Sequence, residues 1–239
     1  MAYRVPRIIK SHISKVISTV VYPALSKLQT EKEQEKEGFL KSFEANLSIV
    51  FPLSALTILL APEFVTVFLG EEWASMIPLM RILSAAGLVW SFLLMTGPLF
   101  QANGMPNLVF WAQTVRLILV ASFIYPLTQS LGLTGVSLSI LVANIGAFLF
   151  SWIKVLRILS FSLKRQISLF IPIALPSLFL TATVWYSKML FQGQNLLSFF
   201  IGGLSGVLVY FIGLYLFWKL FKIGPVRLLY WFKKVYKSA

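Results

Sequence analysis

The chain has 239 residues, of which 58% are hydrophobic and 12% charged, and its mean hydropathy is +0.82. These proportions exclude a soluble globular domain, because so few charged side chains cannot cover its surface, and a disordered chain, which needs low hydrophobicity. The formal net charge is +13 and all eight acidic residues are glutamates, so we expect an all-α polytopic membrane protein whose excess basic residues need a separate explanation.

The first predicted element, residues 1–25, is an amphipathic helix. Its polar stripe consists of Arg7, Ser11, Ser14, Ser18 and Tyr22, flanked by Lys10 and Lys15, with apolar residues on the opposite face. The periodicity alone fits either a spanning helix whose stripe lines a water-filled cavity or a helix lying flat on the membrane. His12 lies off the centre of the stripe, where packing or hydrogen bonding is favoured over proton transfer.

Six further stretches are long and apolar enough to cross a bilayer core, which takes about 20 helical residues. A charged loop over 26–42, expected to be cytoplasmic, precedes them. The predicted spans are 43–61, 77–101, 107–128 and 132–153 within the segment 43–160, and 167–187 and 196–218 within the segment 161–221. Gly104 and Gly132 mark short turns between spans. Residues 222–239 form a predicted basic tail.

The basic residues predict the orientation. When the spans alternate, most Lys and Arg side chains fall on the loops 26–42 and 154–166 and on the C-terminal end, whereas the opposite side holds Lys188 with three glutamates. Short loops rich in Lys and Arg face the cytoplasm, which predicts a cytoplasmic C-terminus. Nucleic acid is therefore disfavoured as a partner, because the basic residues are divided among loops and no recognition motif accompanies them.

Arg116 is the most informative polar residue within a predicted span. It lies ten residues into 107–128, about 15 Å deep and near the membrane midplane. An arginine at that depth costs roughly 2.5–3.5 kcal/mol on insertion scales and usually faces a cavity or a partner. Gln113 shares its helix face, so we favour a cavity role for both side chains over snorkelling to the interface.

Other polar and small residues predict mainly architecture. Glu44 opens the first strong span, where capping is favoured over a coupling-ion site, and Asn144 is expected to make an interhelical hydrogen bond. Arg81 lies close to a span end and is expected to snorkel to the outer interface. Close helix approach is predicted at small residues spaced for one helix face: Gly135, Ser139, Ala143, Ala147 and Ser151, and again Gly202 and Gly206.

Several segments resemble one transporter family. They are AYRVP at 2–6, VVYPALSKLQ at 20–29, FPLSALTILLAPEFVTVFLGEEWASMIPLMRILS at 51–84, QANGMPN at 101–107 and LGLTGVSLSILVAN at 131–144. This combination resembles the C-terminal half of oligosaccharide-lipid flippases, the lipopolysaccharide, O-antigen and teichuronic-acid exporters of the multidrug/oligosaccharidyl-lipid/polysaccharide superfamily. The resemblance is good over 2–160 and only compositional beyond.

The resemblance implies one lobe, with about seven transmembrane helices, of a two-lobed transporter with a central cavity. It implies that 1–25 spans the bacterial cytoplasmic membrane and that the chain is a fragment, whose missing partner is an N-terminal lobe or a separate half-chain. The implied substrate is an undecaprenyl-pyrophosphate-linked oligosaccharide, moved by alternating access. Our hypothesis places Arg7, Lys10, Lys15 and Arg116, with Gln113, in a cationic cavity, and leaves Glu44 or His12 for ion coupling.

Three alternatives stay open at this point. A cation or drug exporter of the same superfamily would favour acidic cavity residues, which the cationic stripe argues against. A membrane glycosyltransferase or polymerase is disfavoured, because the sequence has no Asp or Cys and one His, which leaves few acid, base, nucleophile or metal-ligand candidates. The half-chain alone could also be inactive. We therefore expect no catalytic residue, cofactor or metal site, and membrane lipid as a partner.

Overall fold

The structure is a computed structural model that describes residues 32–160, 163–191 and 195–221. These residues form helices and no strand, which confirms the all-α prediction. The elements are α2 Lys32–Leu59, α3 Ala61–Phe68, the 3-10 helix η1 Glu71–Trp73, α4 Met76–Ala102, α5 Asn107–Leu131, α6 Leu133–Leu159, α7 Leu163–Leu190 and α8 Asn195–Phe221. Five of the described helices, α2, α4, α5, α6 and α8, are long and apolar enough to cross a membrane. The predicted helix 1–25 and the predicted tail 222–239 lie outside the described residues.

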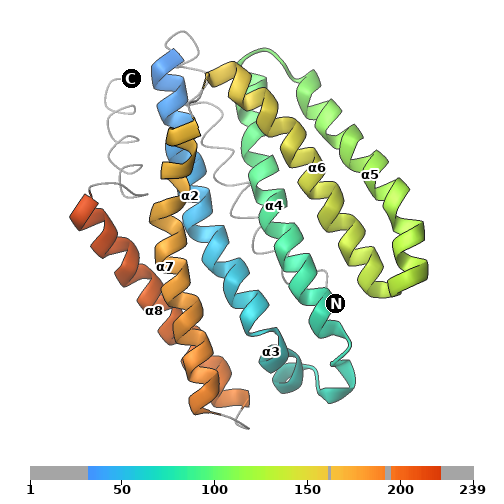
Figure 1. The fold of residues 1–239 in the computed structure, drawn as a ribbon, viewed down its shortest axis with the longest axis vertical. Helices are drawn as coiled ribbons and strands as arrows, with labels where there is room; N and C mark the ends of the chain where they lie inside the picture. The colour runs from blue at the N-terminus through green and yellow to red at the C-terminus, as the bar shows by residue number, and fades with distance from the viewer. Residues whose placement is uncertain (1–31, 161–162, 192–194, 222–239) are drawn as a thin grey trace.

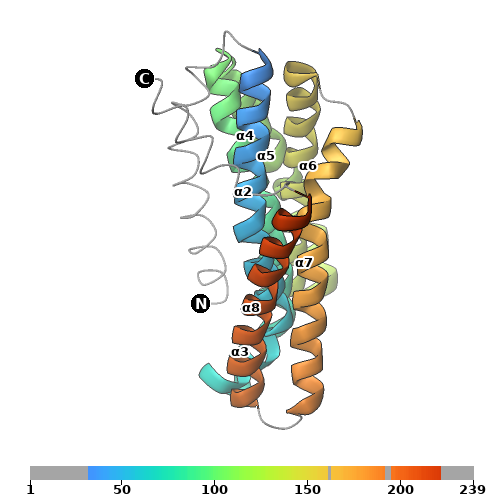
Figure 2. The ribbon, with the colours of Figure 1, turned by 90° about the vertical axis from the view of Figure 1, so that its left-hand side faces the viewer.

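The long helices lie side by side in a row. The spatial order is α5, α6, α4, α2, α7 and α8, so that α2 and α4 are central and α5 and α8 are at the two edges (Figure 1). Viewed from the α8 edge, α7 and α8 lie in front of the other helices (Figure 2), and α8 crosses α7 obliquely (Figure 1). The short α3 continues from α2 and contacts α4 and α8.

The start of α2 corrects the predicted loop over 26–42. Residues 32–42 form the first turns of α2, because their charges are spaced for pairing on one helix. The ion pairs are Lys32–Glu35 at 3.2 Å, Lys36–Glu33 at 3.5 Å and Lys41–Glu37 at 3.0 Å. Glu35 has no exposed surface and also accepts a hydrogen bond from the amide of Asn103 at the end of α4.

A seam of polar contacts joins α2 to α4 along their whole length. From one end to the other, the pairs are Glu35 with Asn103, Asn46 with Ser91, the Ser54 carbonyl with Ser84 and the Ile58 carbonyl with Arg81. The two numbers of each pair change in opposite directions at nearly the same rate, as antiparallel packing requires. Because lipid offers no hydrogen bonds, such pairs fix the register of two helices whose apolar faces would tolerate sliding.

A proline in α2 explains one contact with α8. Pro52 has no N–H, so the carbonyl of Ser48, four residues earlier, loses its partner in the helix. The hydroxyl of Tyr210 on α8 donates to that carbonyl at 2.9 Å, and the Tyr210 side chain is almost fully buried. Neighbouring helices commonly satisfy the backbone groups that prolines free in membrane helices. Pro52 thereby defines a docking point for α8.

Small residues set the closest helix approaches, as predicted. Gly135, Ser139, Ala143, Ala147 and Ser151 of α6 are all buried. A Cβ atom on Gly135 would lie 1.8 Å from the Leu127 carbonyl oxygen of α5, and one on Gly206 would lie 2.8 Å from the Val184 side chain of α7. The predicted turn glycines Gly104 and Gly132 have φ angles of 68° and 59°, which favour glycine.

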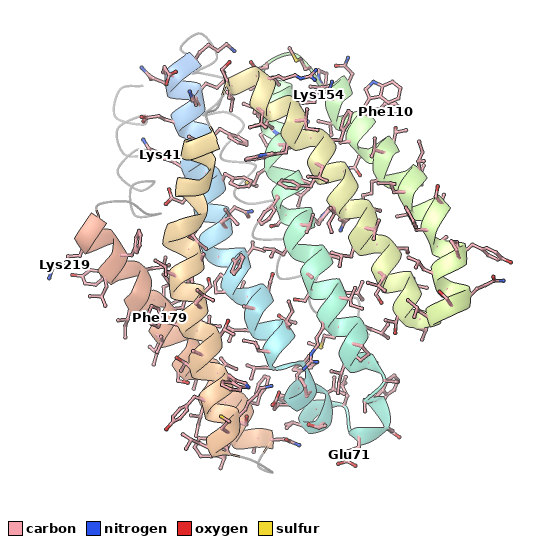
Figure 3. All side chains as sticks on the ribbon, viewed as in Figure 1. Lys41, Glu71, Phe110, Lys154, Phe179 and Lys219 are labelled. Carbon is pink, nitrogen blue, oxygen red and sulfur yellow. The ribbon has the colours of Figure 1, made fainter. Side chains whose placement is uncertain are left out.

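Charge is distributed unequally between the two ends of the long helices. Lys41 and Lys154 lie toward the end where α2 begins and α6 finishes, and Glu71 lies at the opposite end (Figure 3). The apolar side chains Phe110 and Phe179 point away from the helix row, on α5 and α7 (Figure 3), and both are exposed. An apolar exterior between polar ends is what a polytopic membrane protein presents to lipid.

Tyr210→Phe should lower the free energy of unfolding by about 1–2 kcal/mol, because it leaves the Ser48 carbonyl buried without a donor. Pro52→Ala restores the N–H that this carbonyl lost, so Tyr210→Phe should cost far less in the Pro52→Ala background. Denaturant titration of the four proteins in mixed micelles measures this coupling. Equal costs in both backgrounds would contradict the role assigned to Pro52.

Gly135→Ala should destabilise the α5–α6 hairpin by roughly 1–3 kcal/mol or more, because the added methyl group meets backbone atoms that cannot rotate away. Gly97→Ala is the matched control on α4, where a Cβ atom has no neighbour within 4 Å. The control should be neutral or stabilising, since alanine favours helices over glycine. Thermal unfolding in detergent tests the pair, and similar melting points would refute the predicted close approach.

Candidate functional site

The described residues include three of the predicted site residues. Arg116 and Gln113 lie on α5, and Glu44 lies on α2. Arg7, Lys10, Lys15 and His12 lie outside the described residues. Because α4 and α6 separate α2 from α5 in the row, the structure does not bring Glu44 together with Arg116 and Gln113.

Arg116 is held by two other helices. Its Nε–H donates to the side-chain oxygen of Asn144 on α6 at 2.7 Å, and its guanidinium carbon lies 4.4 Å from the centre of the Trp90 ring on α4. Stacking on an indole is worth about 0.5–2 kcal/mol, and the larger value applies when water is excluded. Arg116 is half-buried, so its charge is oriented by the fold and is not sealed inside it.

Asn144 extends this network into α4. The residue is 3% exposed, and its amide donates to the Ala86 carbonyl at 2.9 Å while its oxygen accepts from Arg116. Both ends of one amide are thus used, as a buried polar group requires. The predicted interhelical hydrogen bond of Asn144 is confirmed. The network Arg116–Asn144–Trp90 joins α5, α6 and α4 at one height along the helix axes.

Gln113 and Glu44 take different positions from Arg116. Gln113 is exposed on α5. Among the described residues, it makes no hydrogen bond to Arg116, Asn144 or Trp90. Glu44 is 7% exposed and lies well inside α2, which begins at Lys32. Glu44 therefore cannot cap the helix, so the predicted capping role is wrong, because the span starts earlier than its apolar residues indicated.

Two buried glutamates were missed by the sequence reasoning. Glu35 contacts Lys32 and Asn103, and Glu63 at the start of α3 forms an ion pair of 2.8 Å with Lys188 of α7. The position of Lys32, three residues before Glu35, could have indicated their ion pair. No sequence spacing could have paired Glu63 with Lys188, which lies far along the chain. Among the described residues, no three His, Cys, Asp or Glu side chains gather as metal ligands.

Comparison with known proteins gives a consistent relationship. Residues 1–78 match the family model described as polysaccharide biosynthesis protein. The lipopolysaccharide biosynthesis protein WzxC of Escherichia coli (strain K12) is 28% identical over 182 residues, covering 74% of this chain and 37% of that protein. The teichuronic acid biosynthesis protein TuaB of Bacillus subtilis (strain 168) is 22% identical over 185 residues, covering 77% and 37%.

A third relative is an uncharacterized membrane protein in the cps region of Klebsiella pneumoniae, 29% identical over 147 residues, which are 62% of this chain and 30% of that protein. The aligned part of this chain thus corresponds to about a third of each relative's length.

A solved structure shows the same fold. The lipid II flippase MurJ in its inward closed conformation superposes with a TM-score of 0.78 over 91% of this chain and 46% of that chain, at 19% sequence identity. The helix row therefore has the architecture of about half of this flippase. The predicted resemblance is confirmed: this polytopic helical membrane protein is similar to polysaccharide biosynthesis proteins and shares its fold with part of a lipid flippase.

Proposed function

We propose that this chain takes part in moving a lipid-linked oligosaccharide across the bacterial cytoplasmic membrane, for the assembly of a cell-surface polysaccharide. The polysaccharide biosynthesis relatives and the flippase fold support the class of function. The observation that carries the proposal is the fixed guanidinium of Arg116 in the middle of α5, far from both helix ends. Undecaprenyl pyrophosphate is the carrier that we propose.

The chemistry of such a substrate explains the need for this arginine. A pyrophosphate group is anionic and crosses hydrocarbon only if positive charge replaces its hydration. A guanidinium has planar, forked N–H donors that match phosphate oxygens two at a time. Trp90 and Asn144 hold that plane in one orientation, so less side-chain entropy is lost when a phosphate binds. We place Arg7, Lys10, Lys15 and Gln113 as further contributors to the same cationic cavity.

Transport by alternating access requires a second lobe in this proposal. The chain corresponds to 46% of the MurJ chain and to smaller shares of its other relatives, and we propose that an N-terminal lobe or a separate half-chain completes the cavity. We assign the end with Lys41 and Lys154 to the cytoplasm, following the positive-inside rule. Glu44 and His12 are the candidates for ion coupling, and no covalent step on the substrate is proposed.

Substitution of Arg116 tests the proposal at the level of binding. Purified chain should bind undecaprenyl pyrophosphate more tightly than the uncharged lipid undecaprenol, as measured by native mass spectrometry. Arg116→Gln should reduce the pyrophosphate affinity by about tenfold or more, because it removes a charge-assisted contact worth about 1.5–3 kcal/mol. Arg116→Lys should retain part of the preference, since it keeps the charge and loses the planar fork.

Arg157→Gln provides the matched control, because Arg157 is exposed at the end of α6 and lies outside the network. It should bind both lipids as the unaltered chain does. In cells, Arg116→Glu should abolish surface polysaccharide while the protein remains in the membrane at its normal level. Normal surface polysaccharide in this variant, or undiminished pyrophosphate binding by Arg116→Gln, would show that Arg116 only supports the fold.

A further inference from the structure

The two described side chains that hold Arg116 are both uncharged. Its Nε–H donates to the side-chain oxygen of Asn144 at 2.7 Å, and its guanidinium carbon lies 4.4 Å from the centre of the Trp90 ring. Ionisable residues inside membrane helices commonly pair with a residue of opposite charge, which cancels the charge of both. An amide and an indole ring orient a guanidinium and do not neutralise it. Asn144 and Trp90 therefore support Arg116 while its positive charge remains.

The three helices of this network supply no carboxylate side chain. Arg116 is the one charged residue of α5, and α4 and α6 contain neither aspartate nor glutamate. Four of the eight glutamates of the chain pair with lysines of α2 or α7, and these are Glu33, Glu35, Glu37 and Glu63. Glu44 lies on α2, which α4 and α6 separate from α5 (Figure 1). The sequence of α4, α5 and α6 thus keeps negative charge away from the arginine.

The orientation of the Asn144 amide is fixed from the side opposite Arg116. Its NH2 group donates to the Ala86 carbonyl at 2.9 Å, so its oxygen is turned toward Arg116. Asn144 is 3% exposed. Ala86 lies one helical turn before Trp90 on α4, so both supports of Arg116 lead to the same turn of that helix. A negatively charged side chain of the same shape at position 144 would meet the same guanidinium and cancel its charge.

We propose that Asn144 determines the charge selectivity of the Arg116 site. Its neutral amide positions the guanidinium and leaves the positive charge for a ligand, which makes the site selective for a phosphate-bearing lipid over an uncharged lipid. Asn144 is a positioning residue, because it contacts Arg116 and acts on the ligand through it. The inference rests on the function proposed above and assigns the residue that decides which ligand charge the site accepts.

Asn144→Asp tests the role of charge, because aspartate has nearly the shape of asparagine and carries a negative charge. The quantity to measure is the preference of the purified chain for undecaprenyl pyrophosphate over undecaprenol, by native mass spectrometry. Asn144→Asp should lower this preference by about tenfold or more, because an ion pair between the new carboxylate and Arg116 competes with the phosphate.

Asn144→Leu separates the effect of position from the effect of charge. Leucine has a similar volume, makes neither hydrogen bond and leaves Arg116 charged. The preference should fall by about threefold or less, because only the fixed orientation of the guanidinium is lost. Both variants lose the donor to the Ala86 carbonyl, so a role of Asn144 confined to the fold predicts equal losses of preference in the two. Thermal unfolding in detergent checks that both variants are folded.

Gln113 allows the charge to be changed without disturbing a buried contact. It is exposed on α5, three residues before Arg116, where helix neighbours meet. Gln113→Lys should restore much of the preference in the Asn144→Asp background, because it returns the cancelled positive charge. Gln113→Glu alone should lower the preference. Gln129→Glu is the matched control, since it makes the same change at an exposed position about 20 Å further along α5, and it should leave the preference unchanged.

Three results would overturn the proposal. One is an Asn144→Asp variant with the lipid preference of the unaltered chain. Another is an equal loss of preference in Asn144→Asp and Asn144→Leu, and the third is a preference that neither substitution of Gln113 changes. A preference that Arg116→Gln removes and Asn144→Asp retains would refute the role of Asn144 alone. If Asn144→Asp lowers the preference while its cells form normal surface polysaccharide, the charge-selective site is upheld and the transport function is refuted.

Discussion

The requirement that every backbone polar group find a partner within the protein shapes this helix row, because lipid supplies none. The requirement is most visible around α2, where Pro52 and Pro62 each remove one N–H. The Ser48 carbonyl that Pro52 frees is satisfied by Tyr210 of α8, and the Ile58 carbonyl that Pro62 frees by Arg81 of α4. Two prolines that weaken a helix in isolation therefore provide points at which neighbouring helices attach. They help to explain why α2 lies at the centre of the row, with its neighbours fixed in register.

The same requirement explains why the candidate site is well ordered. Arg116 near the middle of a membrane helix is costly unless its donors and charge are matched. Asn144 accepts from its Nε, and Trp90 covers one face of the guanidinium, while Asn144 also donates to the Ala86 carbonyl. A rigid support of this kind gives the arginine a defined direction before any ligand arrives. Arg116 can therefore support the fold and also bind a phosphate group. The proposed measurement of lipid binding by the Arg116→Gln variant tests the second role.

Small residues and charge pairs provide the remaining contacts between helices. Glycines allow α6 to approach the backbone of α5, and α8 to approach side chains of α7, which adds dispersion energy without a hydrophobic driving force. Such interfaces are tight. The Glu63–Lys188 ion pair is of a different kind, because it joins α3 to α7 by charge. The fold therefore combines closely packed pairs of helices with a charge pair at the α2–α3 junction.

The sequence by itself determined the class of protein, the approximate helices, the turn glycines and the small-residue faces, because these follow from local hydrophobicity and backbone geometry. It also indicated Arg116 and Asn144 as polar residues that need partners, but not that they are each other's partner. Only the tertiary structure decided that Glu44 lies inside α2 instead of capping it, that Trp90 covers Arg116, and that Glu63 meets Lys188. These contacts join helices far apart in the chain, and helical periodicity gives the face of a residue without giving the helix that packs against it.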